Sequence, residues 1–299
     1  MLINNNALDL VFKGFKSVYT DAYDKAPANA LDVAMQVPRA SREETYGWLG
    51  QFPQLREWIG ARVVHGLEAH SFSILNKKFE STIRVKREDI ADDKIGVFKP
   101  VLSEMGWLAR QHPEEMVFGL LESGFEAPCF DGQNYFDTDH PLTNKKGEPI
   151  TVSNMQAGTD PAWYLLDTSR MVRPIVWQIR EDYEFQRMDR SEDPHVFLND
   201  EYLYGIRARV NAGFGLWQLA YASKAPLTPA NYAAARAAMM SYRSDGGRVL
   251  GVMPNKLVVP PTLESAALSV LNTELTDTGG SNPWKNTADL IVTPFLDAA

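Results

Sequence analysis

The sequence has a single cysteine, Cys129, among its 299 residues. One cysteine cannot form a disulfide within the chain, and this scarcity fits a reducing compartment. We interpret Cys129 as a small buried apolar residue rather than a nucleophile. Long apolar runs are also missing, since no stretch approaches the roughly 18 residues of a membrane span. The first residues lack the basic and apolar regions of a secretory signal. We therefore expect neither a membrane span nor a signal peptide.

Familiar catalytic and nucleotide-binding motifs are absent as well. The sequence contains no Walker loop, no G-x-G-x-x-G, no H-E-x-x-H and no G-x-S-x-G. Positive charge is scarce too, with 30 Lys and Arg against 38 Asp and Glu and a net charge of −8. Because nucleic-acid binders neutralise phosphates with basic side chains, this balance argues against tight nucleic-acid binding. A protein that only encloses DNA needs no such attraction.

One short run could carry chemistry. Asp137, Asp139 and His140 form a D-x-D-H pattern that could bind a divalent metal or act as acid and base. No other histidine or carboxylate is spaced to complete such a set, and Asp and His beside Pro141 are also ordinary turn formers. We therefore favour a turn and keep a metal-dependent hydrolase as an alternative. We expect no catalytic residue, metal or cofactor.

The sequence does contain the composition of a soluble globular protein, with 44% apolar and 23% charged residues. Its length allows one large or two ordinary domains. The most informative stretch is residues 72–122. It begins with a candidate strand at Phe72–Leu75, followed by an extended run from Phe79 to Ile90 in which apolar and charged residues alternate. A period of two predicts a half-buried strand. Its basic face indicates either a solvated surface or a projecting arm that meets acidic surfaces of a neighbouring copy.

A long helix is predicted next, from Asp92-Asp93 to a stop at Gly124. About 27 residues at ~1.5 Å each would form a rod of ~40 Å, longer than most globular helices. Pro113 predicts a bend or break near Gln111–Pro113, because proline removes a backbone donor and crowds the preceding turn. The apolar stripe expected to face the core comprises Val97, Val101, Met105, Leu108, Met116 and Leu120.

The remaining segments predict a mixed α+β fold. Residues 1–40 resemble an arm that packs on another surface, with a short amphipathic helix near 7–24. From Gly124 onward a turn-rich stretch precedes strands within 162–187, 196–222, 249–252, 256–259 and 289–296. Helices are predicted from Thr228-Pro229 to Asp245 and from Pro260 to Leu271. Gly205, Gly213 and Gly215 indicate bulges or close strand approach.

Several runs resemble the major head subunit of Mu-like phages and prophages. The resemblance extends over nearly the whole chain and lies in runs rather than single residues. The runs are Glu44–Gly60, Asn76–Ile90, His112–Leu121, Phe130–Pro141, Trp163–Arg170, Tyr204–Ala220, Leu257–Pro261 and Asn282–Pro294.

The resemblance implies a capsid fold of the Hong Kong 97 type. It assigns residues 1–40 to an N-terminal arm and 41–90 to an extended loop with its returning strand. Residues 91–123 would be the spine helix of a peripheral domain. Residues 124–299 would be an axial domain, with 194–222 contributing a strand to the peripheral domain.

The resemblance also implies a structural, non-enzymatic function. Pentamers and hexamers would close into an icosahedral shell around double-stranded phage DNA, with arms and loops overlapping neighbours. The expected partners are further copies of the chain and scaffold, portal and decoration proteins, without a membrane. The shell would assemble in the bacterial cytoplasm and become part of the virion, and no fused scaffold or processed leader is expected. A minor virion or tail component is a second alternative.

Overall fold

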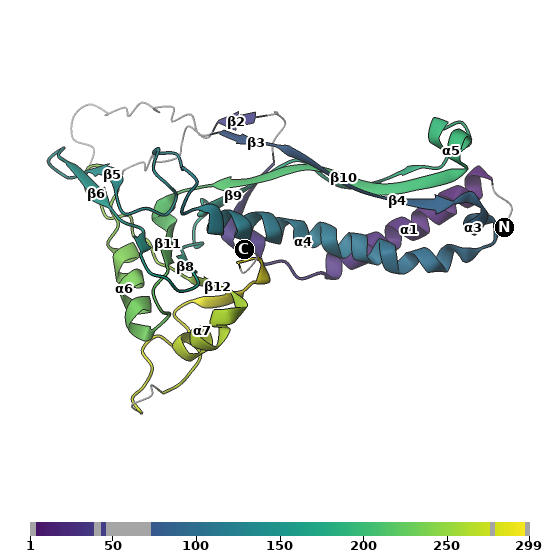
Figure 1. Ribbon diagram of the computed structural model, residues 1–299. Coiled ribbons are helices and arrows are strands. Elements are labelled where there is room, and N and C mark those ends of the chain that lie inside the picture. Colours follow the sequence, from purple (N-terminus) through teal and green to yellow (C-terminus); the bar gives the residue numbers. More distant parts are fainter. Residues whose placement is uncertain (1–3, 39–42, 46–72, 276–278, 297–299) are drawn as a thin grey trace.

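The computed structural model describes residues 4–38, 43–45, 73–275 and 279–296, and it has the expected mixture of helices and sheets. Figure 1 shows two parts of different shape. The long part holds a four-stranded sheet and two long helices that extend to the right of the view. The compact part holds a five-stranded sheet and two shorter helices to the left and below. The middle of the predicted extended loop, residues 46–72, lies outside the described residues.

The sheet of the long part has the strand order β1-β9-β10-β4. At its centre lies a hairpin of β9 (Ile175–Met188) and β10 (Glu201–Phe214), each 14 residues long. β4 (Lys77–Lys86) pairs antiparallel with β10, and β1 (Ala34–Pro38) pairs parallel with β9. A strand from residues 77–86 therefore lies beside a hairpin that begins almost ninety residues later, which local sequence patterns cannot indicate.

The side-chain alternation predicted for the long strands is confirmed. On β4, Val85 is buried while Arg84 and Lys86 are exposed. On β10, the buried face carries Tyr202, Tyr204, Ala208 and Val210. Gly205 is needed where the two strands approach, because a Cβ there would lie 2.8 Å from the carbonyl oxygen of Ser81.

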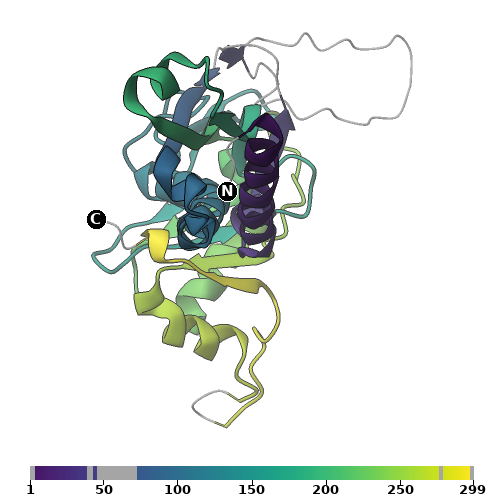
Figure 2. The same cartoon turned by 90° about the vertical axis from the view of Figure 1, so that its right-hand side faces the viewer.

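Two helices, α1 (Asn5–Lys25) and α4 (Lys99–Ser123), lie side by side and cover one face of this sheet (Figure 2). α1 is the amphipathic helix predicted near 7–24. Its first turn is capped by Asn4, whose side chain accepts a hydrogen bond of 2.8 Å from the Ala7 N–H. Its buried stripe of Leu8, Val11, Phe15 and Tyr19 packs with α4, β9 and β10 in the core of the long part.

The apolar stripe predicted for the long helix is partly wrong. Val97, Val101 and Leu108 are 70%, 49% and 58% exposed. Met105 is buried as predicted, and Met116 and Leu120 are partly buried against the core. The other residues of the face that packs on α1 and the sheets are Leu102, Ala109, Val117, Phe118 and Leu121. Apolar residues occur on both arcs of this helix, so their period predicts a helix but does not decide which arc faces the core.

The predicted limits of the long helix also need correction. The strand β4 ends at Lys86, and residues Arg87–Ala91 form a short helix, α3, instead of continuing the strand to Ile90. Asp93 adopts a left-handed conformation with φ of 61°, which ends α3 and delays the start of α4 to Lys99. Of the bend or break predicted near Gln111–Pro113, the break is absent, because α4 continues through Pro113 as one helix. It ends before Gly124 as expected.

Residues 4–38 pack on their own chain. After α1, a helical turn, α2 (Ala30–Val33), leads into β1, which joins the sheet beside β9. The surface expected to receive this arm is thus formed by α4 and β9 of the same subunit. β2 (Glu43–Thr45) pairs with β3 (Ser73–Leu75), so both ends of the segment 46–72 meet at one place.

The compact part is built on the sheet β13-β12-β8-β11-β7. Its strands are β7 (Met155–Gln156), β8 (Trp163–Leu166), β11 (Ala220–Ser223), β12 (Lys256–Val259) and β13 (Asp289–Val292). The hairpin of β5 (His140–Thr143) and β6 (Pro149–Val152) projects from it. Its helices are α6 (Pro229–Met240) and α7 (Glu264–Leu271).

Three sequence predictions in this region differ from the structure. α6 is capped by Thr228 as expected, but it ends at Met240, before the predicted stop at Asp245. Residues 249–252 form no strand. Residues Pro194–Asn199 form a short helix, α5, where an extended run was predicted from Val196. None of the helices in the described residues is long and apolar enough to cross a membrane.

Candidate functional site

The D-x-D-H run does not converge into one site. His140 begins β5 and is fully buried, whereas Asp139 is exposed. Asp137 accepts a hydrogen bond of 2.7 Å from the Thr138 N–H, the local bond of a turn former. A hydrogen bond with Asp137 raises the pKa of Asp139. The two aspartates therefore interact with each other and with the turn. The three residues proposed for the hydrolase alternative do not form one metal-binding or catalytic site.

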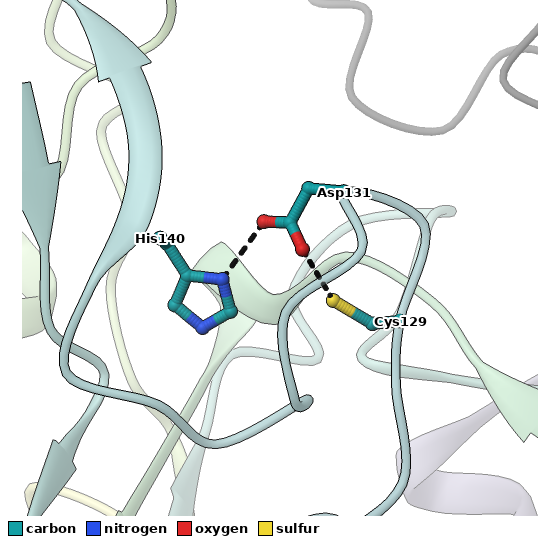
Figure 3. A group of neighbouring side chains, drawn as sticks. All are labelled: Cys129, Asp131 and His140. Carbon is teal, nitrogen blue, oxygen red and sulfur yellow. Dashed lines mark hydrogen bonds and ion pairs between the residues drawn. The ribbon is translucent and has the colours of Figure 1, made fainter. Parts of the chain in front are cut away.

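His140 instead belongs to a cluster with Asp131 and Cys129 (Figure 3). One carboxylate oxygen of Asp131 lies 2.8 Å from His140 Nδ1, and the other accepts a hydrogen bond of 3.0 Å from the Cys129 thiol. The Gln133 N–H donates to the same oxygen as the thiol, at 3.1 Å. Burial alone would raise the pKa of Asp131, but the hydrogen bonds from His140 and Cys129 outweigh it and lower that pKa.

The second nitrogen of His140 is also occupied. Its Nε2 lies 3.1 Å from Asn154 Oδ1. The backbone fixes the orientation of that amide, because Asn154 Oδ1 accepts from the Asp137 N–H at 2.9 Å and Nδ2 donates to the Tyr135 carbonyl at 2.8 Å. The imidazole stacks on Trp217, with ring centroids 4.0 Å apart and planes inclined by 12°. The cluster therefore ties the turn-rich residues 128–156 to the segment before β11.

The donor set does not fit a metal ion. Cys129, Asp131 and His140 are the only group of three His, Cys, Asp or Glu ligand atoms close enough to hold an ion in the described part of the chain. Burial raises the pKa of the Cys129 thiol, so the thiolate that a metal requires is disfavoured. Both His140 nitrogens already have partners. The cluster is a hydrogen-bonded structural node, and the interpretation of Cys129 as buried, at 5% exposure, is confirmed.

Sequence reasoning found one member of this node as a candidate ligand, His140, and missed its partners. Asp131, Asn154 and Trp217 are distant from one another in sequence and belong to no spacing motif. The available signal was the accumulation of Asp, Asn and Gly in residues 130–141, which indicates turns whose side chains bond to the backbone.

A second functional feature is the way α4 holds the N-terminal segment. One oxygen of the buried Glu114 accepts hydrogen bonds of 2.5 and 2.6 Å from the N–H groups of Asn29 and Ala30, at the start of α2. Gln111 donates to the Pro27 carbonyl at 2.6 Å. Arg173 donates to the carbonyls of Leu31 and Ala34. Burial raises the pKa of Glu114, although the two backbone bonds act in the opposite direction.

The far end of the N-terminal helix is held by charge. Arg187, on β9, pairs with Asp9 of α1 and with Asp189, and its guanidinium lies 4.6 Å from the centre of the Phe12 ring. Asp189 is almost fully buried and also accepts a hydrogen bond from Tyr204 at 3.3 Å. These contacts hold both ends of residues 5–34 against the long part.

The outer surface of the long part is partly apolar. Val97, Val101, Trp107 and Leu108 are exposed along one side of η1 (Lys94–Phe98) and α4. Phe197 and Leu198 of α5 are also exposed, at the end of the β9–β10 hairpin. A single subunit leaves this surface uncovered, which is typical of a protein that associates with further chains.

The arrangement of long hairpin, long helix and compact sheet defines the class of protein. The structure matches a chain in the procapsid of bacteriophage JBD30 with a TM-score of 0.87 and 44% identity, covering 98% of this chain and 100% of that one. The fold is thus that of a phage shell subunit, the Hong Kong 97 type, and the fold predicted from the resemblance is confirmed.

The family follows from the sequence. The model of the family "Mu-like prophage major head subunit gpT" matches residues 8–296. The "Major capsid protein" of Escherichia phage Mu is 38% identical over 305 residues, which cover 99% of this chain and 100% of that protein. The "Mu-like prophage FluMu major head subunit" of Haemophilus influenzae is 40% identical over 272 residues, 89% of this chain and 88% of the relative. The chain belongs to the Mu-like major head subunit family, a family of structural capsid proteins.

Proposed function

We propose that this major head subunit assembles into pentamers and hexamers, and that these close into an icosahedral shell around double-stranded phage DNA. The observation that carries the proposal is the shell-subunit fold over the whole chain together with an uncovered apolar surface on its long part. Burial of such surface against neighbouring copies supplies the free energy of association. The net charge of −8 suits a wall that encloses DNA without binding it tightly.

The proposal also assigns each part of the subunit to a domain of the capsid fold. The four-stranded sheet with α1 and α4 supports a peripheral domain, to which the whole β9–β10 hairpin contributes. Of the predicted peripheral stretch 194–222, residues up to Phe214 lie in this hairpin, whereas β11 belongs to the five-stranded sheet. The five-stranded sheet with α6 and α7 supports an axial domain at the capsomer centre. Residues 1–40 would be the arm and 41–90 the extended loop. Because α1 packs on its own subunit, the extended loop carries more of the proposed overlap between neighbours than the arm.

The proposed partners are further copies of the chain first, then scaffold, portal and decoration proteins of the same phage. The name of one further solved structure, a JBD30 capsid decorated with minor capsid protein trimers, describes such a partner for that phage. Assembly would take place in the host bacterial cytoplasm, and the mature location would be the virion head.

Sedimentation of the purified chain, with and without the other head proteins of its phage, tests the proposal. We expect capsomer-sized oligomers or particles far heavier than the 33.5 kDa monomer. A variant with Val101 and Leu108 both changed to Asp should shift the distribution towards the monomer, since these exposed side chains lie on the proposed association surface. A wild-type chain that stays monomeric under all salt and crowding conditions would contradict the function.

A further inference from the structure

Two exposed apolar features have no partner among the described residues. The first is a hollow of about 360 Å³ between β4 and α4. The apolar residues that line it are Ile83, Pro100, Val101, Met105 and Leu108. Because Val101 and Leu108 are 49% and 58% exposed, the wall of the hollow on α4 is accessible from outside.

The second feature is the tip formed by α5, which joins β9 to β10 and stands at the end of the long part (Figure 1). Val196 is buried at 3% exposure and fixes the short helix on the hairpin. The two residues that follow it point away, with Phe197 81% and Leu198 76% exposed. Two adjacent large apolar side chains at such exposure form a small protruding knob, and a chain gains free energy when it covers one.

The knob and the hollow match in size and character. A phenylalanine buries roughly 150–250 Å² when enclosed, and the hollow lies at the small end of the about 300–1,000 Å³ typical of protein clefts. It therefore has room for one or two side chains rather than for a whole helix. Its lining is mainly apolar, as an enclosed Phe and Leu require.

The charge beside the knob disfavours a contact between two knobs. The turn into α5 carries Glu192 and Asp193, which form no salt bridge within the described part of the chain. Two like acidic tips repel each other. The hollow has one charged residue in its lining, Glu104, so the match between the two features rests on their apolar side chains.

We propose that Phe197 and Leu198 of one subunit insert into the hollow between β4 and α4 of a second copy. The inference rests on the proposed shell, and it names one contact within it. The contact is heterologous, because the tip and the hollow are different surfaces, and its repetition forms a ring when the rotation between neighbours closes, as the proposed capsomers require. Two side chains supply only part of the 1,200–2,000 Å² or so of a stable interface, so this contact acts together with others.

Disulfide cross-linking tests the contact directly. The native Cys129 is buried and its thiol has a raised pKa, so it stays out of the reaction. In a double variant, Phe197→Cys with Leu108→Cys, mild oxidation of assembled particles should link subunits into a ladder on a non-reducing gel. Reducing agent should abolish the ladder, and neither single variant should give more than background dimer.

Two results would overturn the contact. One is wild-type-like particles of the double variant that give no ladder. The other is efficient dimer formation by the Phe197→Cys variant alone, since the tips would then meet each other. Neither result contradicts the proposed shell. A wild-type chain that forms no particles, in contrast, contradicts both the shell and the contact.

A second pair of variants covers the case in which the cysteine double variant forms no particles. Phe197→Asp should lower particle yield at least tenfold while the circular dichroism of the subunit stays that of the wild type. Ser191→Asp adds the same charge in the same exposed turn and removes no apolar side chain, so its yield should stay within twofold. Equal yields from the two variants would overturn the proposal.

Discussion

At the scale of single residues, the half-buried carboxylate of Asp131 and the buried carboxylate of Glu114 are placed in opposite electrostatic environments. Asp131 accepts hydrogen bonds from a thiol, an imidazole and a backbone N–H, which stabilise its charged form and lower its pKa. Glu114 also accepts two backbone bonds, but its burial dominates and raises its pKa. The two residues should therefore give the folded subunit opposite dependences on pH.

The first prediction concerns Asp131. Asp131→Asn should lower the free energy of unfolding by about 1–3 kcal/mol at neutral pH, because it weakens the half-buried hydrogen bond with the buried His140. Since the folded pKa of Asp131 is lowered, its contribution is present above the usual value of about 3.9 and is lost as the pH falls through the folded pKa. Urea unfolding of both proteins across acidic pH measures this difference.

Asp139→Asn is the matched control for Asp131, since Asp139 is exposed in the same loop. It should change stability by less than about 0.5 kcal/mol. The difference in free energy of unfolding between the wild type and Asp131→Asn should shrink in acid. A difference that stays constant from neutral pH down to strong acid would contradict the role given to the carboxylate.

The second prediction concerns Glu114. Glu114→Ala should lower the free energy of unfolding by about 2–4 kcal/mol, because the N–H groups of Asn29 and Ala30 lose their acceptor. Glu114→Gln keeps a carbonyl oxygen and should cost less. Because the folded pKa of Glu114 is raised, its favourable contribution is complete below the usual value of about 4.3 and is lost as the pH rises through the folded pKa.

The stability of the wild type relative to Glu114→Gln should therefore decline as the pH is raised from about 4 to neutral. Thermal unfolding of the two proteins over this range provides the measurement, with the exposed Glu115→Gln as control. A relative stability that increases with pH would show that the backbone bonds outweigh burial at Glu114.

At the scale of elements, the contact between α1 and α4 depends on Gly106. A Cβ at this position would overlap the carbonyl oxygen of Tyr19 and lie 3.1 Å from the Cβ of Ala22. The backbone of α1 cannot move away without losing the packing of its buried stripe. The close approach of these two helices thus selects glycine in the middle of a long helix, where glycine otherwise lowers stability.

The third prediction follows from this contact. Gly106→Ala should destabilise the subunit by about 1–3 kcal/mol through overpacking. Gly119→Ala lies in the same helix, where an added Cβ meets nothing within 4 Å, and should stabilise it by about 0.5–1 kcal/mol. Urea unfolding followed by circular dichroism compares them. Equal effects of the two substitutions would show that α1 and α4 do not pack as described.

Sequence patterns predicted the features of each element that neighbouring residues determine, and they missed the features that depend on tertiary packing. The caps at Thr228 and the strand alternation of β4 and β10 could be predicted, because neighbouring residues determine them. The buried arc of α4 could not, since it depends on the position of α1. Pro113 was expected to bend or break α4, but the helix is not broken, since buried residues on both sides of the proline pack it in place.

The structural node around His140 shows the same limit. The D-x-D-H spacing identified His140 but assigned it to Asp137 and Asp139, which are its neighbours in sequence. Its partners in the fold, Asp131, Asn154 and Trp217, come from three segments that only the sheets and turns bring together. The function was predictable because the resemblance extends over the whole chain and did not depend on any single residue.

At the scale of the whole molecule, the subunit is shaped for contact with copies of itself. The long part is one helix layer and one sheet layer thick, so most of its elements reach a surface that neighbours can cover. Its exposed apolar residues include Val101 and Leu108 on α4, Phe197 and Leu198 at the α5 tip, and Leu10 on α1. The compact part has its own sheet, and one continuous apolar core joins it to the near ends of α4, β9 and β10.

Cryo-electron microscopy of particles formed by the full chain, together with the other head proteins of its phage, tests the central claim most directly. The account predicts closed icosahedral shells in which this chain forms both fivefold and sixfold clusters. Open tubes, single rings, or the presence of this chain at only a few copies per particle would contradict it.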